Sequence, residues 1–163
     1  MNVLESHSST LCIIPCGAKK SIEQGEKAKK ARGAYSSPFF KDTLSYAEKF
    51  HPDNYRILST KYGLITGDTE IEWYEEKYFP AEVQTLMHSQ IDQQELRKYT
   101  RIIALVSSGS FLEIVNKIFF HLEKNNICAP LNIFFKLNAQ KWSPMCKAIR
   151  NCVDTGRPFD CHG

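Results

Sequence analysis

Short apolar runs alternate along the chain with longer segments in which apolar residues recur every three or four positions. The runs at residues 11–15, 55–59 and 101–106 are rich in isoleucine, leucine and valine, as buried β-strands are, and a fourth run lies at 131–135. The segments with helical spacing lie at 39–50, 81–98, 111–125 and 142–152. Strands that alternate with helices predict an α/β fold, a three-layer sandwich with a mostly parallel central sheet.

Three of the predicted strands end in loops of small and polar residues. The loops read Cys16-Gly17-Ala18-Lys19-Lys20, Ser59-Thr60-Lys61-Tyr62-Gly63 and Ser107-Ser108-Gly109-Ser110. Ligands of open α/β folds bind where the carboxyl ends of parallel strands meet. Glycine lets the backbone approach a ligand, while lysine and serine supply charge and hydrogen bonds. The loops therefore predict a site for an anionic or polar ligand, with helix N-capping as the alternative role of Ser108 or Ser110.

The length of 163 residues fits one α/β domain over residues 1–163, with 1–10 and 155–163 predicted to be extended tails. The segment 1–10 is polar and carries Glu5, which is not the pattern of a signal peptide. No apolar run reaches the roughly 18 residues that span a bilayer. We therefore expect a cytoplasmic monomer without a membrane partner.

The six cysteines contain no CxxC pair, and their spacing matches no common zinc site. We expect free thiols in a reducing compartment, and neither a metal nor another cofactor. Cys16 lies in the first strand-end loop without a histidine near it in the sequence. It is therefore expected to line a ligand rather than to act as a nucleophile.

The net charge of +3 is small, but the charges are unevenly distributed. Residues 27–41 hold five basic side chains and no acid, with Tyr35, Phe39 and Phe40 among them. Residues 68–76 hold five acidic side chains and no base. A basic segment with aromatic residues suits contacts with nucleic-acid phosphates and bases. A solvated charged surface is the alternative.

The acidic segment offers two candidate catalytic carboxylates, Asp68 and Glu72, close to the aromatic pair Trp73-Tyr74. A carboxylate beside an aromatic ring can act as a general base or stabilise a developing cation. Such a pair suits N-glycosidic cleavage, whose transition state is oxocarbenium-like. A solvated acidic turn is the alternative. The five histidines lie outside the strand-end loops, which disfavours a histidine-centred hydrolase.

Several separated motifs occur in an order that resembles a known group of proteins. They read Ile13-Ile14-Pro15-Cys16-Gly17-x-Lys19-Lys20, then Tyr35 and Phe39-Phe40, then Ile57-Leu58-Ser59-x-Lys61-Tyr62-Gly63-Leu64-Ile65, then Ile71-x-x-Tyr74. This order is similar to that of a bacterial and phage family of small domains related to the peroxide-stress YaaA proteins. The YaaA proteins carry a similar L-S-x-x-Y-G-L-L followed by an acidic I-x-x-Y segment. The resemblance covers about residues 11–110.

Members of this broad group resemble the uracil-DNA-glycosylase fold. They include archaeosine-synthesis proteins and small defence glycosylases that remove modified bases from phage DNA. The resemblance implies that Cys16–Lys20 and Ser107–Ser110 bind a flipped base and its flanking phosphates. The chain has no G-x-D-P-Y after its first strand and no late H-P-S loop. The usual water-activating aspartate and late histidine thus have no counterpart, which argues against uracil as the substrate.

Together these observations predict a DNA glycosylase that cleaves the N-glycosidic bond of a modified base, in anti-phage defence, with modified phage DNA as its partner. Asp68 or Glu72 would stabilise the sugar cation or position water. The expected substrate-binding residues are Cys16, Gly17, Lys19, Lys20, Tyr35, Ser59, Lys61, Tyr62, Tyr74, Ser107, Ser108 and Ser110. Two alternatives remain: a YaaA-like DNA-binding or stress protein without catalysis, and a nucleoside hydrolase or deoxyribosyltransferase that acts on free nucleotides.

Overall fold

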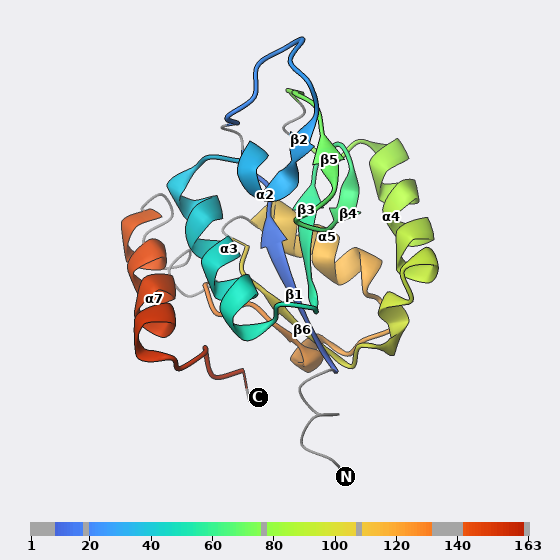
Figure 1. The fold of residues 1–163 in the computed structure, drawn as a ribbon. Helices are drawn as coiled ribbons and strands as arrows, with labels where there is room; N and C mark the ends of the chain where they lie inside the picture. Colours follow the sequence, from blue (N-terminus) through green and yellow to red (C-terminus); the bar gives the residue numbers. More distant parts are fainter. Residues whose placement is uncertain (1–8, 18–19, 76–77, 107–108, 132–141, 162–163) are drawn as a thin grey trace.

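A five-stranded sheet forms the centre of the molecule in the computed structural model, which describes residues 9–17, 20–75, 78–106, 109–131 and 142–161 (Figure 1). The strand order is β4-β3-β1-β6-β7. β1 pairs in parallel with both β3 and β6, and β6 pairs in parallel with β7. β4 is antiparallel to β3. The strands are β1 (Thr10–Pro15), β3 (Tyr55–Ser59), β4 (Gly63–Ile65), β6 (Arg101–Ala104) and β7 (Ile127–Cys128).

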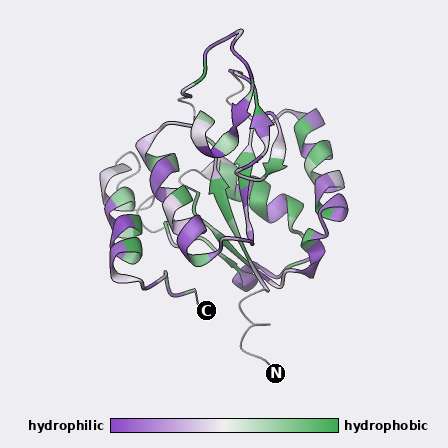
Figure 2. Ribbon diagram, in the orientation of Figure 1, coloured by the Kyte–Doolittle hydropathy of each residue, from purple (hydrophilic) through white to green (hydrophobic). Residues whose placement is uncertain are grey.

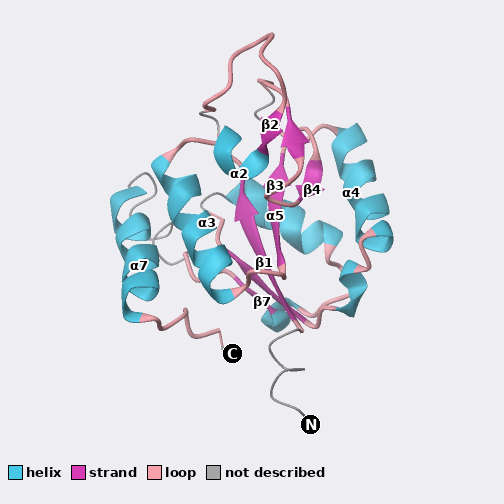
Figure 3. Ribbon diagram, viewed as in Figure 1, coloured by secondary structure: helices cyan, strands magenta, loops and turns pink. Residues whose placement is uncertain are grey.

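Helices cover both faces of this sheet (Figures 1 and 3). On one face lie α3 (Pro38–Phe50) and α7 (Trp142–Thr155), and on the other lie α4 (Ala81–Gln93) and α5 (Gly109–Ile118). Successive side chains of β1 enter opposite cores, Cys12 and Ile14 the first and Leu11 and Ile13 the second. The central strands are accordingly mostly apolar, as Figure 2 shows. The predicted α/β architecture with a mostly parallel central sheet is confirmed.

The carboxyl ends of β1 and β6 form a switch point in the topology. The two strands are neighbours, yet α3 follows β1 on one face and α5 follows β6 on the other. Chains that leave adjacent strands in opposite directions open a crevice at their carboxyl ends, where open α/β sheets bind ligands. In Figure 1 this edge faces β2 (Lys29–Lys30), α2 (Ala31–Ala34) and β5 (Glu70–Ile71), at the end of the molecule opposite both termini.

Two predicted helices end earlier than their apolar spacing indicates. The segment 81–98 divides at Glu95, whose φ of 56° breaks the helix, and a 3-10 turn, η1 (Leu96–Lys98), follows. α5 ends at Ile118, and the remainder of the predicted 111–125 helix contains only the 3-10 turn η2 (Lys124–Asn126). At the first break the apolar spacing continues to the buried Leu96 of η1, because a 3-10 turn keeps a similar side-chain period.

The predicted last strand and the predicted C-terminal tail do not coincide with the elements of the structure. Residues 132–135 of the predicted 131–135 strand lie outside the described residues, and the edge strand next to β6 is β7. The predicted tail begins at Thr155, but α7 includes that residue and ends before Gly156, whose φ is 73°. At the other end, Thr10 already belongs to β1.

Two segments predicted as long loops contain short regular elements. The 17–38 connection includes β2 and α2, and the 61–74 loop includes β4 and β5. β2 and β5 pair with each other as a separate antiparallel ribbon. Elements of two to four residues are too short to show a hydrophobic period, so they escape detection in the sequence.

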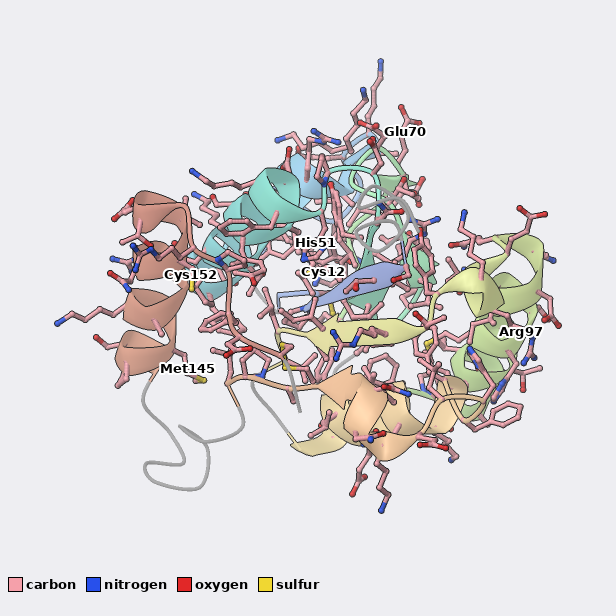
Figure 4. All side chains as sticks on the ribbon, turned by 90° about the horizontal axis from the view of Figure 1, so that it is seen from below. Cys12, His51, Glu70, Arg97, Met145 and Cys152 are labelled. Carbon is pink, nitrogen blue, oxygen red and sulfur yellow. A yellow bond between two sulfur atoms is a disulfide. The ribbon has the colours of Figure 1, made fainter. Side chains whose placement is uncertain are left out.

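Two of the six cysteines are joined, which corrects the prediction that all are free thiols. Cys128 in β7 forms a disulfide with Cys161, and this bond ties the C-terminal segment to the sheet edge. Cys12, Cys16, Cys146 and Cys152 carry free thiols, and Figure 4 shows Cys12 in the sheet and Cys152 on α7. None of the described helices is long and apolar enough to cross a membrane.

Candidate functional site

The first two strand-end loops meet at the carboxyl edge of the sheet. Pro15 of β1 is in register with Leu58 of β3, and the Cys16 amide donates a hydrogen bond of 3.0 Å to the Leu58 carbonyl. Cys16 and Ser59 therefore lie on adjacent strand ends. With Lys20, Tyr35 and Tyr74 they form a polar group that we call the carboxyl-edge cluster.

Ser59 is fully buried and organises the turn that follows β3. Its Oγ accepts hydrogen bonds from the backbone amides of Lys61, at 3.2 Å, and Tyr62, at 3.0 Å. Gly63 completes the turn with a φ of 74°, a conformation that glycine adopts without strain. A Cβ at this position would collide with the side chain of Gln90. The Tyr62-Gly63 motif is thus a requirement of the turn.

Two glutamines at the end of α4 hold this turn from the side. The Gln90 side chain accepts from the Leu64 amide at 2.8 Å and donates to the Tyr62 carbonyl at 2.9 Å. The Gln94 side chain donates to the Leu64 carbonyl at 3.0 Å and accepts from Arg56 at 2.7 Å. Sequence reasoning missed both residues, because glutamine on an amphipathic helix is indistinguishable from the solvent-facing positions.

Three buried hydroxyls form a closed ring at the centre of the cluster. The Tyr35 hydroxyl lies 2.6 Å from that of Tyr74 and donates to Ser59 Oγ at 3.3 Å. The Ser59 and Tyr74 oxygens are 3.0 Å apart. Every hydroxyl donates once if Tyr35 donates to Ser59, Ser59 to Tyr74 and Tyr74 to Tyr35. Burial raises the pKa of both tyrosines, so both phenols are protonated at neutral pH.

The two tyrosines reach the sheet edge from segments far apart in the sequence. Tyr35 follows α2 and pairs with Lys20 in an isolated antiparallel bridge, whereas Tyr74 follows β5. Their rings meet edge to face, with centroids 6.4 Å apart, and Tyr62 packs edge to face on Tyr74 at 5.6 Å. The outer ribbon of β2 and β5 therefore determines where both phenols lie.

Lys20 places its ammonium over the aromatic rings. Nζ lies 4.0 Å from the centroid of the Tyr74 ring and 5.9 Å from that of Tyr35. Burial lowers the pKa of this ammonium, and the negative charge of Glu75 opposes that effect. Lys61 is the more exposed of the two lysines, and its Nζ lies 5.5 Å from the centroid of Tyr62 and 5.9 Å from that of Tyr74.

The Cys16 thiol is partly buried against the cluster. Burial raises its pKa, while hydrogen bonds with Thr60 and Tyr74 and the charge of Lys20 act in the opposite direction. A thiol with a raised pKa is protonated at neutral pH, and the thiolate is the reactive form. This arrangement fits a side chain that lines a site better than it fits a nucleophile.

Neither of the two predicted catalytic residues belongs to the carboxyl-edge cluster. Asp68 is two-thirds exposed and lies 3.6 Å from Lys30 Nζ and 3.1 Å from Arg32 Nη2. Glu72 is exposed and follows the buried Ile71, and its backbone amide donates to the Tyr62 hydroxyl at 3.1 Å. A catalytic role for either residue stays a prediction. The carboxylate whose charge acts on the cluster is Glu75, which sequence reasoning did not single out.

The basic segment 27–41 lies on the surface next to this edge. All five of its basic side chains are exposed, and three of them have partners in the structure. Lys30 pairs with Asp68, Arg32 pairs with Asp68 and Glu48, and Lys29 donates to Ser21. Exposed ion pairs of this kind contribute little and are readily exchanged for a phosphate.

The remaining predicted residues are placed less fully. Gly17 is half-buried beside Cys16, and Ser110 is exposed in the first turn of α5. Lys19, Ser107 and Ser108 lie outside the described residues. Of the predicted binding residues, Cys16, Lys20, Tyr35, Ser59, Lys61, Tyr62 and Tyr74 are therefore the ones that the structure brings together.

Other parts of the molecule offer less chemistry. Within the described ranges, no group of three or more histidine, cysteine, aspartate or glutamate side chains is arranged to hold a metal ion. An open pocket of about 570 Å³ lies between α7 and the C-terminal segment, lined in part by Cys152, Arg157 and Asp160. The segment that follows α7 runs at the end of the molecule away from β2, α2 and β5 (Figure 1). The usual location of ligands in such folds favours the carboxyl edge.

Comparison with known proteins gives a family but no activity. The chain is 42% identical over 60 residues to the uncharacterized protein YfjM of Bacillus subtilis (strain 168), a match that covers 36% of this chain and 39% of that protein. No solved structure matches the chain. A family model matches residues 11–127, which include nearly the whole sheet and the whole carboxyl-edge cluster. The chain belongs to the family of unknown function DUF6884.

Proposed function

We propose that this protein cleaves the N-glycosidic bond of a modified base in DNA. The observation that carries the proposal is the carboxyl-edge cluster, where Tyr35, Ser59 and Tyr74 share hydrogen bonds beside the Lys20 ammonium. Aromatic faces, hydroxyls and a cation are the groups that hold a nucleobase and its phosphates. They lie at the carboxyl ends of β1 and β3, next to the switch point between β1 and β6, and open α/β sheets bind ligands at this edge.

The surface around the cluster supports a nucleic acid over a free nucleotide. The exposed basic side chains of 27–41 extend from β2 and α2 to the first turn of α3. A stretch of this length suits several consecutive phosphates of a DNA strand, whereas a mononucleotide needs only one phosphate contact. In the proposal, the target base leaves the helix and enters the edge next to Tyr74, while the strand follows the basic surface.

The resemblance to proteins of the uracil-DNA-glycosylase fold is part of this proposal. A mostly parallel sheet with helices on both faces is compatible with that fold. The place of the first strand-end loop beside the cluster supports its assignment to base binding. Uracil is not the proposed base, because the water-activating aspartate after the first strand has no counterpart in this sequence.

The proposal is tested by incubating the protein with unmodified DNA and with DNA from phages that carry modified bases, followed by alkali. Abasic sites break in alkali, so strand breaks confined to a modified DNA support the proposal. Tyr74→Phe, which removes one hydroxyl of the cluster, should lose most of this activity, and Tyr78→Phe, at an exposed tyrosine, should keep it. An absence of breaks on every DNA would refute glycosylase activity.

A second candidate is a DNA-binding protein without catalysis. It is favoured by the surroundings of Asp68, whose carboxylate pairs with Lys30 and Arg32, and by the exposure of Glu72. This candidate predicts salt-dependent DNA affinity with no released base. It also predicts that Asp68→Ala and Glu72→Ala together leave the cellular effect intact, whereas a glycosylase that uses either carboxylate loses its effect.

A further inference from the structure

We propose that Lys20 is a nucleophile, and that its amine attacks C1′ of the deoxyribose and gives the protein abasic-site lyase activity. The inference rests on the proposed function for its substrate class, a DNA strand, and assigns Lys20 a role other than a phosphate contact. It rests on the position of the Lys20 side chain within the cluster, which differs from that of the other basic residues near the edge.

Backbone contacts with the end of α2 and the residue after it hold Lys20 in place. Lys20 forms an isolated β-bridge with Tyr35, and the amide of the next residue, Ser21, donates to the Ala34 carbonyl at 2.7 Å. Nζ lies over the Tyr74 ring at 4.0 Å from its centroid. A lysine that binds phosphates from the surface extends into solvent, as exposed lysines do, whereas Lys20 is folded against the site.

The surroundings of the amine suit a nucleophile. An amine attacks carbon only in its neutral form, and partial burial disfavours the charged form. Burial lowers the pKa of Lys20, and the negative charge of Glu75 partly offsets that effect. Glu75 is exposed, so it can exchange a proton between the amine and water. The buried phenols of Tyr35 and Tyr74 stay protonated and so add no negative charge that would stabilise the ammonium.

The first reaction step is balanced without any cofactor. The Lys20 nitrogen forms a bond to C1′ while the bond from C1′ to the base breaks, and the leaving base takes the electron pair. The proton lost by the attacking nitrogen passes through Glu75 or water to that base. The nitrogen lone pair then expels the ring oxygen, which takes a proton from water, and the product is a Schiff base at C1′.

The second step cleaves the strand. A carboxylate or water removes a proton from C2′, the electrons form a new double bond, and the bond from C3′ to oxygen breaks with departure of the 3′ phosphate. Water then adds to the Schiff base and releases the aldehyde, which restores the Lys20 amine. A preformed abasic site enters the same sequence directly, since its open-chain form already carries an aldehyde at C1′.

Trapping on preformed abasic DNA tests this inference independently of base removal. The protein is incubated with a duplex that contains one abasic site in the presence of sodium borohydride, which reduces a Schiff base to a stable amine. We expect a covalent protein–DNA adduct on a denaturing gel, with peptide mass spectrometry placing the link at Lys20. Lys20→Arg keeps the charge and should lower trapping by at least about tenfold. Lys49→Arg, at an exposed lysine in the last turn of α3, is the matched control and should retain it.

The outcomes separate the inference from the proposed function. An adduct at another lysine overturns the role of Lys20, and this result does not depend on the stability of any variant, because the adduct is mapped in the unmodified protein. Trapping by Lys20→Arg that equals trapping by the unmodified protein overturns it as well. Base release from modified DNA without any adduct overturns the inference and leaves the glycosylase proposal standing. An adduct at Lys20 without base release from any DNA supports the lyase and refutes the glycosylase. If neither occurs, both are wrong.

Discussion

Removal of the Tyr74 hydroxyl, in Tyr74→Phe, is expected to lower the free energy of unfolding by about 1–3 kcal/mol. The substitution keeps the ring and its edge-to-face contacts with Tyr35 and Tyr62. It leaves the Tyr35 hydroxyl without its 2.6 Å partner and Ser59 Oγ without its 3.0 Å partner. Both oxygens keep other partners, so the cost comes from the two lost hydrogen bonds at about 0.5–1.5 kcal/mol each.

A double-mutant cycle isolates the bond between the two phenols. Tyr35→Phe removes the same 2.6 Å contact and one further bond to Ser59, so its cost falls in the same range. In the double variant the shared bond is lost only once, and the total loss should be smaller than the sum by about 0.5 kcal/mol or more. Replacement of both partners by apolar groups of the same shape is the less costly change.

Urea unfolding at neutral pH, followed by circular dichroism, measures these differences. The dependence of the unfolding free energy on urea concentration should be the same in all variants, since the buried surface is unchanged. Tyr78→Phe is the control, because the Tyr78 side chain is 80% exposed, and its effect should stay within about 0.5 kcal/mol. If the two phenol substitutions each cost as little as the control, or add without coupling, the hydroxyl ring does not exist.

Three further results follow from the same geometry. Gly63→Ala should lower the free energy of unfolding in urea by about 1–2 kcal/mol or more, because φ is positive at this position and Gln90 occupies the place of the new Cβ. Gly33→Ala is the control and should be tolerated, since the space around Gly33 is open. Burial raises the pKa of Tyr74 above the ordinary 10.0, so the stabilising effect of its buried phenol is fully present below that pH and is lost above it. The urea midpoint should accordingly fall as the pH rises beyond that value, and less steeply in Tyr74→Phe. Cys161→Ser removes the disulfide with Cys128, whose partners are 33 residues apart. On the chain-entropy account, the free energy of unfolding should fall by about 3–4 kcal/mol relative to the oxidised protein. An unchanged urea midpoint would contradict the presence of this disulfide.

The sequence was sufficient to place the cluster at the sheet edge because two simple rules coincide there. Apolar runs mark the buried strands, and parallel strands bring their carboxyl ends together, so Cys16 and Ser59 had to lie close to each other. Tyr35 and Tyr74 entered the prediction through motifs alone. No periodicity places them, since both are held by the short β2–β5 ribbon and its flanks.

Features that depend on contacts between distant segments were not predictable in this way. Gln90 matters because its amide fits the turn after β3, and Cys128 pairs with a cysteine in the C-terminal segment. Neither the Gln90 hydrogen bonds nor the Cys128–Cys161 disulfide can be inferred from the spacing of nearby residues. The ion pairs of Asp68 with Lys30 and Arg32 are of the same kind, because no local pattern predicts them, and a catalytic role for Asp68 stays a prediction. Local patterns identify chemical groups, but only the fold decides which groups meet.

Mass spectrometry of small molecules released from DNA tests the central claim most directly. The protein is incubated with DNAs that carry different modified bases, and with plain DNA, and the filtrate is analysed for free bases. The account predicts that one modified base appears in an amount that grows with time and enzyme, and that Tyr74→Phe releases far less. Release from free nucleotides alone would assign the protein to nucleoside chemistry, and no released base from any DNA would contradict the claim that the carboxyl-edge cluster is a glycosylase site.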